Sequence, residues 1–229
     1  MAWTYPFSWH DGHIIVENGG GRLLLDTGSP ASIADGPFDF GGRACAPTGA
    51  LLTGLGASID RISELVGLPL TALVGTDVLE EHDLLADPVA GTLTAGDGLS
   101  LEGDRVPLDR FMGIPYTEAT VAGVPMDVFL DTGAKISYLE PLFADEYPSL
   151  GEAEDFYPLL GRFTTPLRAL PVSLDGLDFT LKAGVLPEVL RTLLCLGGMT
   201  GVLGTEVLQD RRFLISLSRL ELVLGPTLE

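Results

Sequence analysis

The chain has few basic residues, and this shortage excludes whole classes of partner. Lys and Arg total 13 against 32 Asp and Glu in 229 residues, which gives a formal net charge of -19. Nucleic-acid binding needs a basic surface that neutralises phosphates, and anionic membranes also repel an acidic protein. No apolar run is long enough to span a bilayer. We therefore expect neither nucleic acid nor membrane as a partner.

Cysteine is also scarce, because Cys45 and Cys195 are the only two. They fall in different halves of the chain, which favours two buried free thiols over a disulfide. The first ten residues lack the basic segment and the apolar core of a secretory signal. Both observations predict a cytoplasmic location.

Hydrophobic residues make up 46% of the chain, enough for a substantial core. The 29 glycines and 16 prolines predict many turns, as in proteins built mainly from short strands. Asn18-Gly19 and Asp175-Gly176 have the composition of tight hairpin turns. Helices are expected at residues 60–67, which end at a glycine, and at residues 187–197.

The clearest pattern is an internal repeat. Residues 23–29 (LLLDTGS) match residues 128–134 (VFLDTGA) at an offset of 105, from Asp26 to Asp131. A second block, residues 73–79 (LVGTDVL), matches residues 202–208 (VLGTEVL), and each is followed by a short helix and a strand. The repeat predicts two β-rich lobes related by a pseudo-twofold axis, at residues 1–107 and 108–229.

Each copy delivers an aspartate to the end of an apolar strand. Continuous apolar runs predict strands that are buried on both faces, where a carboxylate is costly unless hydrogen bonds compensate. Gly28 and Gly133 allow the following loop to turn its N–H groups toward the carboxylate. Placed about a twofold axis, Asp26 and Asp131 would face each other and share one proton. Such a pair can activate a water and protonate a substrate carbonyl, so no metal and no cofactor is expected.

Two Asp-Thr-Gly triplets, each followed by an apolar-Gly block, resemble the aspartic proteases, for which proton sharing between two carboxylates is well established. The short copies are similar to the retroviral type and its bacterial relatives, while the single chain follows pepsin-like logic. The resemblance implies a two-lobed acid-protease fold of the double-psi β-barrel type. It further implies a monomeric aspartic-type endopeptidase acting on peptide or protein substrates, with Asp26 and Asp131 as the catalytic pair.

The resemblance also assigns roles to neighbouring residues. Thr27 and Thr132 match threonines that lock the two loops together. Ser29 matches a position whose hydroxyl often bonds the catalytic aspartate, whereas Ala134 has no hydroxyl. This asymmetry predicts a lower pKa for Asp26 and a shared proton held by Asp131.

Aspartic proteases cover their substrate with a hairpin called the flap. In the first copy, residues 41–56 read as either a reduced hairpin or an open loop, without the tyrosine that pepsins place there. Residues 155–168 of the second copy are the better candidate, with Phe156, Tyr157 and Phe163 available to contact substrate. We therefore expect the flap in the second lobe, the reverse of the pepsin arrangement.

Two alternatives remain open. His10 and His13 form either a metal pair or the ends of a turn, and the turn is favoured because no third ligand is in register. For the whole chain, the alternative to a protease is a catalytically weak or inactive peptide-binding module on the same fold.

Overall fold

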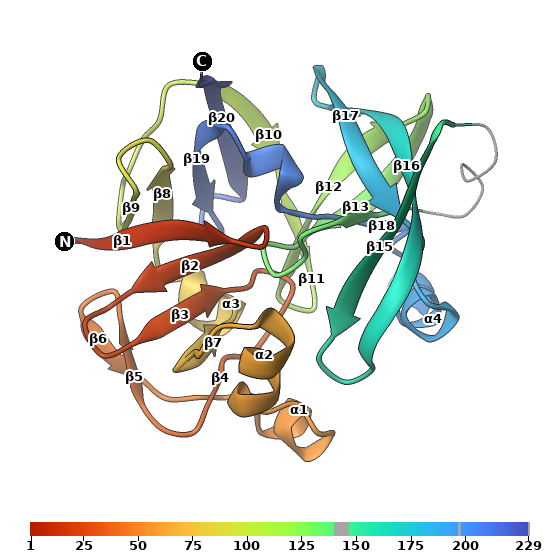
Figure 1. Cartoon of the computed structure of the whole chain (residues 1–229). Coiled ribbons are helices and arrows are strands. Elements are labelled where there is room, and N and C mark those ends of the chain that lie inside the picture. The colour runs from red at the N-terminus through yellow and green to blue at the C-terminus, as the bar shows by residue number, and fades with distance from the viewer. Residues whose placement is uncertain (140–146, 197, 229) are drawn as a thin grey trace.

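The computed structural model describes residues 1–139, 147–196 and 198–228. Two lobes of strands lie side by side, with few helices at their edges (Figure 1). The sequence-based expectation of a mainly β, two-lobed fold is confirmed. None of the helices in the described part of the chain is long and apolar enough to cross a membrane.

The first part of the chain forms ten strands and three helices. They are β1 (Ala2–His10), β2 (His13–Glu17), β3 (Arg22–Leu25), β4 (Ile33–Ala34), β5 (Phe38–Phe40), β6 (Arg43–Cys45), α1 (Ala50–Gly54), α2 (Ile59–Val66), β7 (Ala72–Val74), α3 (Thr76–Leu79), β8 (Asp83–Asp87), β9 (Thr92–Gly96) and β10 (Asp104–Pro107).

The described part of the second half continues with strands, one α-helix and one 3-10 helix. They are β11 (Asp109–Phe111), β12 (Ile114–Val121), β13 (Val124–Leu130), β14 (Ser137–Tyr138), β15 (Ser149–Tyr157), β16 (Gly161–Leu174), β17 (Leu177–Gly184), α4 (Glu188–Leu196), β18 (Gly201–Leu203), η2 (Thr205–Leu208), β19 (Arg211–Ser216) and β20 (Glu221–Thr227).

The repeat in the sequence is a repeat in the strand pairing. β3 runs parallel to β7, with Leu24 opposite Leu73, and β13 runs parallel to β18, with Phe129 opposite Val202. In each lobe a short strand then pairs antiparallel with the same partner, β4 with β7 and β14 with β18. The blocks that match in sequence therefore form the same local structure, and each leads into a short helix and a strand as predicted.

Local signals account for several element ends. Helix α2 begins after Ser58, whose side chain accepts a hydrogen bond from the Arg61 amide, and ends at Gly67 with φ 74°. Helix α4 matches the second predicted helix, whose residue 197 lies outside the described residues. Asp175 (φ 47°) and Gly176 (φ 88°) form the predicted turn between β16 and β17.

The two ends of the chain share one sheet. Its ten strands run in the order β10-β20-β19-β8-β9-β1-β2-β3-β7-β4, while an eight-stranded sheet runs β11-β12-β13-β18-β14-β17-β16-β15. β19 and β20 thus return from the second half to pair with β8 and β10 of the first (Figure 1). The division at residues 107 and 108 stays a prediction, because the ten-stranded sheet draws strands from both sides of it.

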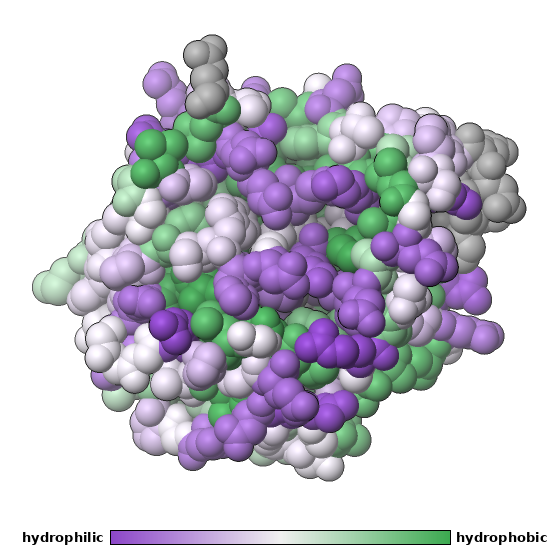
Figure 2. Space-filling model, viewed as in Figure 1, coloured by the Kyte–Doolittle hydropathy of each residue, from purple (hydrophilic) through white to green (hydrophobic). Residues whose placement is uncertain are grey.

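One apolar cluster extends through both lobes, from Phe7 to Leu224, and ties the sheets together. Cys45 is buried with a free thiol in β6, whereas the side chain of Cys195 lies outside what the structure describes. Hydrophilic and hydrophobic side chains are interspersed on the face seen in Figure 2. That mixture is usual for a solvent-exposed surface.

Candidate active site

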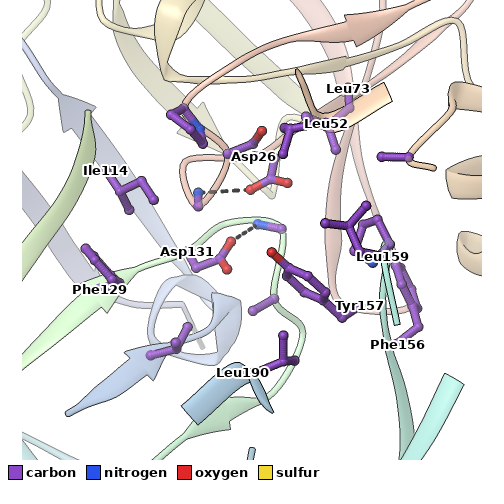
Figure 3. A pocket seen from close by; sticks show the side chains of 18 of the residues that line it. Asp26, Leu52, Leu73, Ile114, Phe129, Asp131, Phe156, Tyr157, Leu159 and Leu190 are labelled. Atoms are coloured by element: carbon purple, nitrogen blue, oxygen red, sulfur yellow. Dashed lines mark hydrogen bonds between the residues drawn. The ribbon is translucent and has the colours of Figure 1, made fainter. Parts of the chain in front are cut away.

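Asp26 and Asp131 emerge from the ends of β3 and β13 in the same way. The Asp26 amide donates to the Val74 carbonyl at 2.9 Å, and the Asp131 amide donates to the Leu203 carbonyl at 2.9 Å. Each carboxylate then accepts a hydrogen bond within its own loop, from the Gly28 amide at 2.9 Å and from the Gly133 amide at 2.8 Å (Figure 3). The two loops are therefore built alike and held to their neighbouring strands.

The two carboxylates lie at the junction of the loops, each against the glycine of the opposite loop, and both line the same cavity. A Cβ atom added to Gly28 would lie 2.3 Å from Cγ of Asp131, and one added to Gly133 would lie 2.5 Å from Cγ of Asp26. Each glycine thus packs against the aspartate of the opposite loop. Any larger residue at either position would push the carboxylates apart.

Thr27 and Thr132 join the loops by an exchange of hydrogen bonds. The Thr27 amide donates to Oγ1 of Thr132 at 3.0 Å, and the Thr132 amide donates to Oγ1 of Thr27 at 3.0 Å. The Thr27 hydroxyl donates in turn to the Leu130 carbonyl at 2.6 Å, and the Thr132 hydroxyl to the Leu25 carbonyl at 2.8 Å. Both threonines are buried, so the four bonds are shielded from water.

Two serines that were not singled out from the sequence tie each Asp-Thr-Gly segment to the second repeated block of its own lobe. The Gly75 amide donates to Oγ of Ser32 at 3.0 Å, and the Gly204 amide donates to Oγ of Ser137 at 3.1 Å. Ser32 and Ser137 are separated by the same 105 residues as the two aspartates. Extending the repeat past the triplets would have found them.

Burial raises the pKa of both aspartates above the ordinary value. For Asp26 desolvation is the largest cause, and the negative charge of Asp131 raises its pKa further. For Asp131 desolvation again dominates, while hydrogen bonds from the Gly133 and Ala134 amides act in the opposite direction. Two carboxyls that interact in one partly buried site cannot both ionise easily, so this geometry favours a single shared negative charge.

The predicted role of Ser29 is wrong. Its hydroxyl donates to the Ala31 carbonyl at 2.7 Å and so does not bond the Asp26 carboxylate. That hydroxyl bond is therefore absent, although the main-chain amide of Ser29 acts to lower the Asp26 pKa against the larger, raising effect of burial. The main-chain carbonyl of Ala31 is the acceptor instead, which the triplet alone does not reveal.

A cavity of about 330 Å³ opens above the dyad and is mostly apolar. Figure 3 shows Leu52 and Leu73 on one side of it, and Ile114, Phe129 and Leu190 around the rest. Ser29, Gly28, Gly133 and Ala134 also line it. The exposed apolar side chains of Met112 and Leu159 also line the cavity. Leu160, which is exposed as well, follows Leu159 along the chain.

The hairpin of β15 and β16, called hairpin β15–β16 below, extends from the second lobe (Figure 1), and residues of it line the cavity. Phe156, Tyr157 and Phe163 all line the cavity, and the Tyr157 ring points toward the dyad (Figure 3). Burial raises the pKa of Tyr157, and the charges of Asp26 and Asp131 raise it further, so the hydroxyl stays protonated. All three aromatic residues singled out in the sequence are therefore at the cavity.

Asp155 and Tyr138 were not singled out as site residues, although both line the cavity. The Tyr138 hydroxyl donates to Oδ2 of the buried Asp155, and the Phe156 amide donates to its Oδ1 at 2.8 Å. Burial raises the pKa of Asp155, and these hydrogen bonds act in the opposite direction. Asp155 is the first residue of the segment predicted as the flap. Its burial could not be predicted, because nothing local distinguishes it from the other acidic residues of this chain.

In the first lobe, residues 41–56 line the cavity with a helix residue and not with a hairpin. This segment matches neither alternative in full, because β5 and β6 form a short hairpin about Gly41 (φ 61°) and Gly42 (φ 73°) and the helix α1 follows it. That hairpin does not line the cavity, whereas Leu52 of the following helix α1 does. His10 and His13 are opposite each other across the β1–β2 turn, as favoured from the sequence.

Several solved structures of proteases are similar to this chain. An aspartic proteinase from Irpex lacteus is similar over 99% of this chain and 98% of its own, with a TM-score of 0.51 and 13% sequence identity. A retropepsin-like aspartic protease from Rickettsia conorii matches 53% of this chain and 88% of its own, with a TM-score of 0.35 and 19% identity. The EIAV protease matches 42% of this chain and 86% of its own, with a TM-score of 0.33 and 19% identity.

No protein-family model matches the chain, and no curated protein matches it at a significant level. The likeness to the Irpex lacteus enzyme runs through both lobes, so it concerns the whole architecture. The resemblance to aspartic proteases in the two Asp-Thr-Gly triplets is confirmed at the level of the fold. The chain has the two-lobed fold of the pepsin-like aspartic proteinases.

Proposed function

We propose that the chain is an aspartic-type endopeptidase whose catalytic pair is Asp26 and Asp131. The observation that supports this most is that each carboxylate lies against the opposite Asp-Thr-Gly loop and that both line one apolar cavity. Carboxylates beneath an apolar cavity are costly unless hydrogen bonds compensate, and each of these two accepts one from its own loop. The Thr27–Thr132 exchange joins the two loops, and the two glycines leave room for the carboxylates between them.

In the proposed reaction, the dyad enters with one proton and one negative charge. The ionised carboxyl takes a proton from a water molecule, whose oxygen attacks the carbon of the scissile amide. The protonated carboxyl donates its proton to the carbonyl oxygen, which gives a neutral gem-diol intermediate. The carboxyl that now holds the proton then donates it to the amide nitrogen, while the other carboxylate takes a proton from one gem-diol hydroxyl. The C–N bond breaks to release a carboxylic acid and an amine, and the dyad again holds one proton. The chemistry uses general acid and base catalysis by this chain's own residues.

Because the cavity is lined mostly by apolar side chains, we propose that the substrate is an extended peptide with apolar side chains near the cleaved bond. Hairpin β15–β16 would cover it, with Tyr157 excluding water from the reacting atoms. Because one chain supplies both aspartates, we propose that the monomer is the active form.

Cleavage of a mixed peptide library between pH 3 and pH 7 tests this function. The parent protein should cut at defined bonds, and Asp26→Asn and Asp131→Asn should each remove cleavage while leaving the fold intact. If the parent protein cleaves no peptide at any pH, the protease hypothesis is ruled out and the inactive peptide-binding module remains. Activity per molecule should not change with protein concentration if the monomer is active.

A further inference from the structure

Helix α2 of the first lobe and hairpin β15–β16 of the second exchange arginine hydrogen bonds. Nε of Arg61, on α2, donates to the Pro158 carbonyl at 3.0 Å. Nη2 of Arg162, on the hairpin, donates to the Leu65 carbonyl of α2 at 3.0 Å and to the Glu64 carbonyl at 3.5 Å. Each element thus gives one guanidinium to the main chain of the other.

The two sides of this contact suit each other chemically. The last carbonyls of a helix have no partner within it, and the negative end of the helix dipole attracts a cation. Arg162 meets both needs at the end of α2. On the hairpin, a Cβ atom at Gly161 (φ 88°) would lie 3.2 Å from Nη2 of Arg61, so glycine leaves room for that guanidinium beside the turn.

An apolar contact lies beneath the polar one. Phe156 packs against the buried cluster that contains Ile62 and Val66 of α2, and its ring lies 5.6 Å from the ring of His13. Tyr157 is the next residue along the strand, and its side chain lines the cavity with its ring toward the dyad (Figure 3). Holding the hairpin against α2 therefore also fixes where Tyr157 stands.

We propose that Arg61 and Arg162 are positioning residues that fasten hairpin β15–β16 to α2 and so set Tyr157 above Asp26 and Asp131. The catalytic part of this inference rests on the proposed function, but the contact itself does not. The hydrogen bonds are exposed and few, so the hairpin can release to admit a substrate and close again. The first lobe, which has no flap over the cavity among its described residues, takes part by providing the surface on which the flap closes.

Hydrogen exchange of the amides in residues 153–165 tests the contact without any assay of activity. The variants are Arg61→Gln, Arg162→Gln and the double variant, with Arg212→Gln as the matched control. Arg212 pairs with Asp87 on the ten-stranded sheet. The double variant should exchange about tenfold faster in the hairpin than the parent, since each lost hydrogen bond is worth a factor of about 2 to 12. Exchange equal to that of the control would overturn the contact.

Steady-state kinetics then tests the positioning role. The double variant should lose about tenfold in kcat/KM. Arg162→Lys should lose less than Arg162→Gln, because lysine keeps the charge but lacks the planar fork. Faster exchange with unchanged kcat/KM would contradict the positioning role while leaving the protease in place. A parent that cleaves nothing would instead overturn the proposed function and the positioning role, and the exchange experiment would still decide whether the contact exists. Thermal unfolding shows that each variant is folded.

Discussion

Thr27 and Thr132 each accept the other's amide hydrogen bond at 3.0 Å while donating to a carbonyl of the opposite strand. The arrangement is reciprocal, so each side chain satisfies two buried main-chain groups of the other lobe. It joins the lobes at the one point where their two aspartates meet. The loops cannot separate without leaving four polar groups unpaired inside the protein.

The first prediction concerns this exchange. Thr27→Val keeps the side-chain shape but leaves the Thr132 amide and the Leu130 carbonyl without partners. We expect it to lower the free energy of unfolding by about 2–4 kcal/mol, because each unsatisfied buried group costs about 1–3 kcal/mol. Urea denaturation measures the change. Thr4→Val, at an exposed hydroxyl pair with Thr94, is the control and should stay within about 0.5 kcal/mol. Equal effects of the two substitutions would show that the exchange does not stabilise the fold.

The second prediction concerns the dyad and pH. Burial raises the pKa of Asp26 in the folded protein above its value in the unfolded chain. Between those two pKa values the folded state binds more protons, so the stability contributed by Asp26 falls as the pH rises through that window. Asp26→Asn removes this penalty. Its melting temperature should therefore exceed that of the parent at pH 7, by about 2–4 °C for each kcal/mol gained, and the gain should shrink near pH 3.

Differential scanning calorimetry at both pH values provides the measurement. Asp77→Asn is unsuitable as a control because Asp77 accepts hydrogen bonds from Ser32 and Thr48. Asp127→Asn, at an exposed position on β13, is a better match. A gain that is the same at pH 3 and pH 7 would mean that Asp26 is not strained by ionisation.

The third prediction concerns Tyr157. Its ring lies over the dyad from the hairpin, so we expect most of its effect to come from excluding water and packing against substrate. Tyr157→Phe should keep kcat/KM within about threefold of the parent, whereas Tyr157→Ala should lose more than about tenfold, roughly the 1.4 kcal/mol that corresponds to that factor. Steady-state cleavage of a peptide found in the library experiment measures both. A large loss in the Phe variant would assign the effect to the hydroxyl instead.

The fourth prediction concerns Tyr138 and Asp155. Tyr138→Phe removes the donor that the Asp155 carboxylate accepts, so the Asp155 pKa should rise further above its ordinary value. The lost bond matters most when Asp155 is ionised. The variant should therefore be destabilised by about 1–3 kcal/mol at pH 7 and by less in acid, where Asp155 is protonated. Unfolding curves at several pH values measure this difference, and a destabilisation independent of pH would point to lost packing alone.

Much of the site could be predicted because it repeats in the sequence. The offset from Asp26 to Asp131 fixed which residues are equivalent, and the apolar runs before them indicated buried strands. That equivalence implies that the two lobes pair alike, as β3 with β7 and β13 with β18 do, but which strands pair comes from the structure. Strand β1 was missed although Trp3, Tyr5, Phe7 and Trp9 alternate with other residues along it, a period of two that indicates a strand.

Other features depend on contacts that no local pattern carries. The Ser29 hydroxyl bonds Ala31 because the turn brings that carbonyl close, which a triplet cannot foretell. The contact between Arg61 and Pro158 joins residues that are 97 positions apart, and neither lies in the repeated blocks. The return of β19 to β8 likewise spans the two halves of the chain. Tertiary structure decides each of these.

The proposed sharing of one proton between Asp26 and Asp131 can be tested directly by carbon NMR of protein labelled at the aspartate carboxyl groups. In a pH titration of the parent, the two carboxyls should titrate together in two steps, with at least one step well above the ordinary aspartate pKa. Asp26→Asn should reduce the pair to a single step at Asp131, and Asp131→Asn should do the same at Asp26. Titration of both carboxyls near the ordinary value, or of one unaffected by replacement of the other, would contradict a paired site.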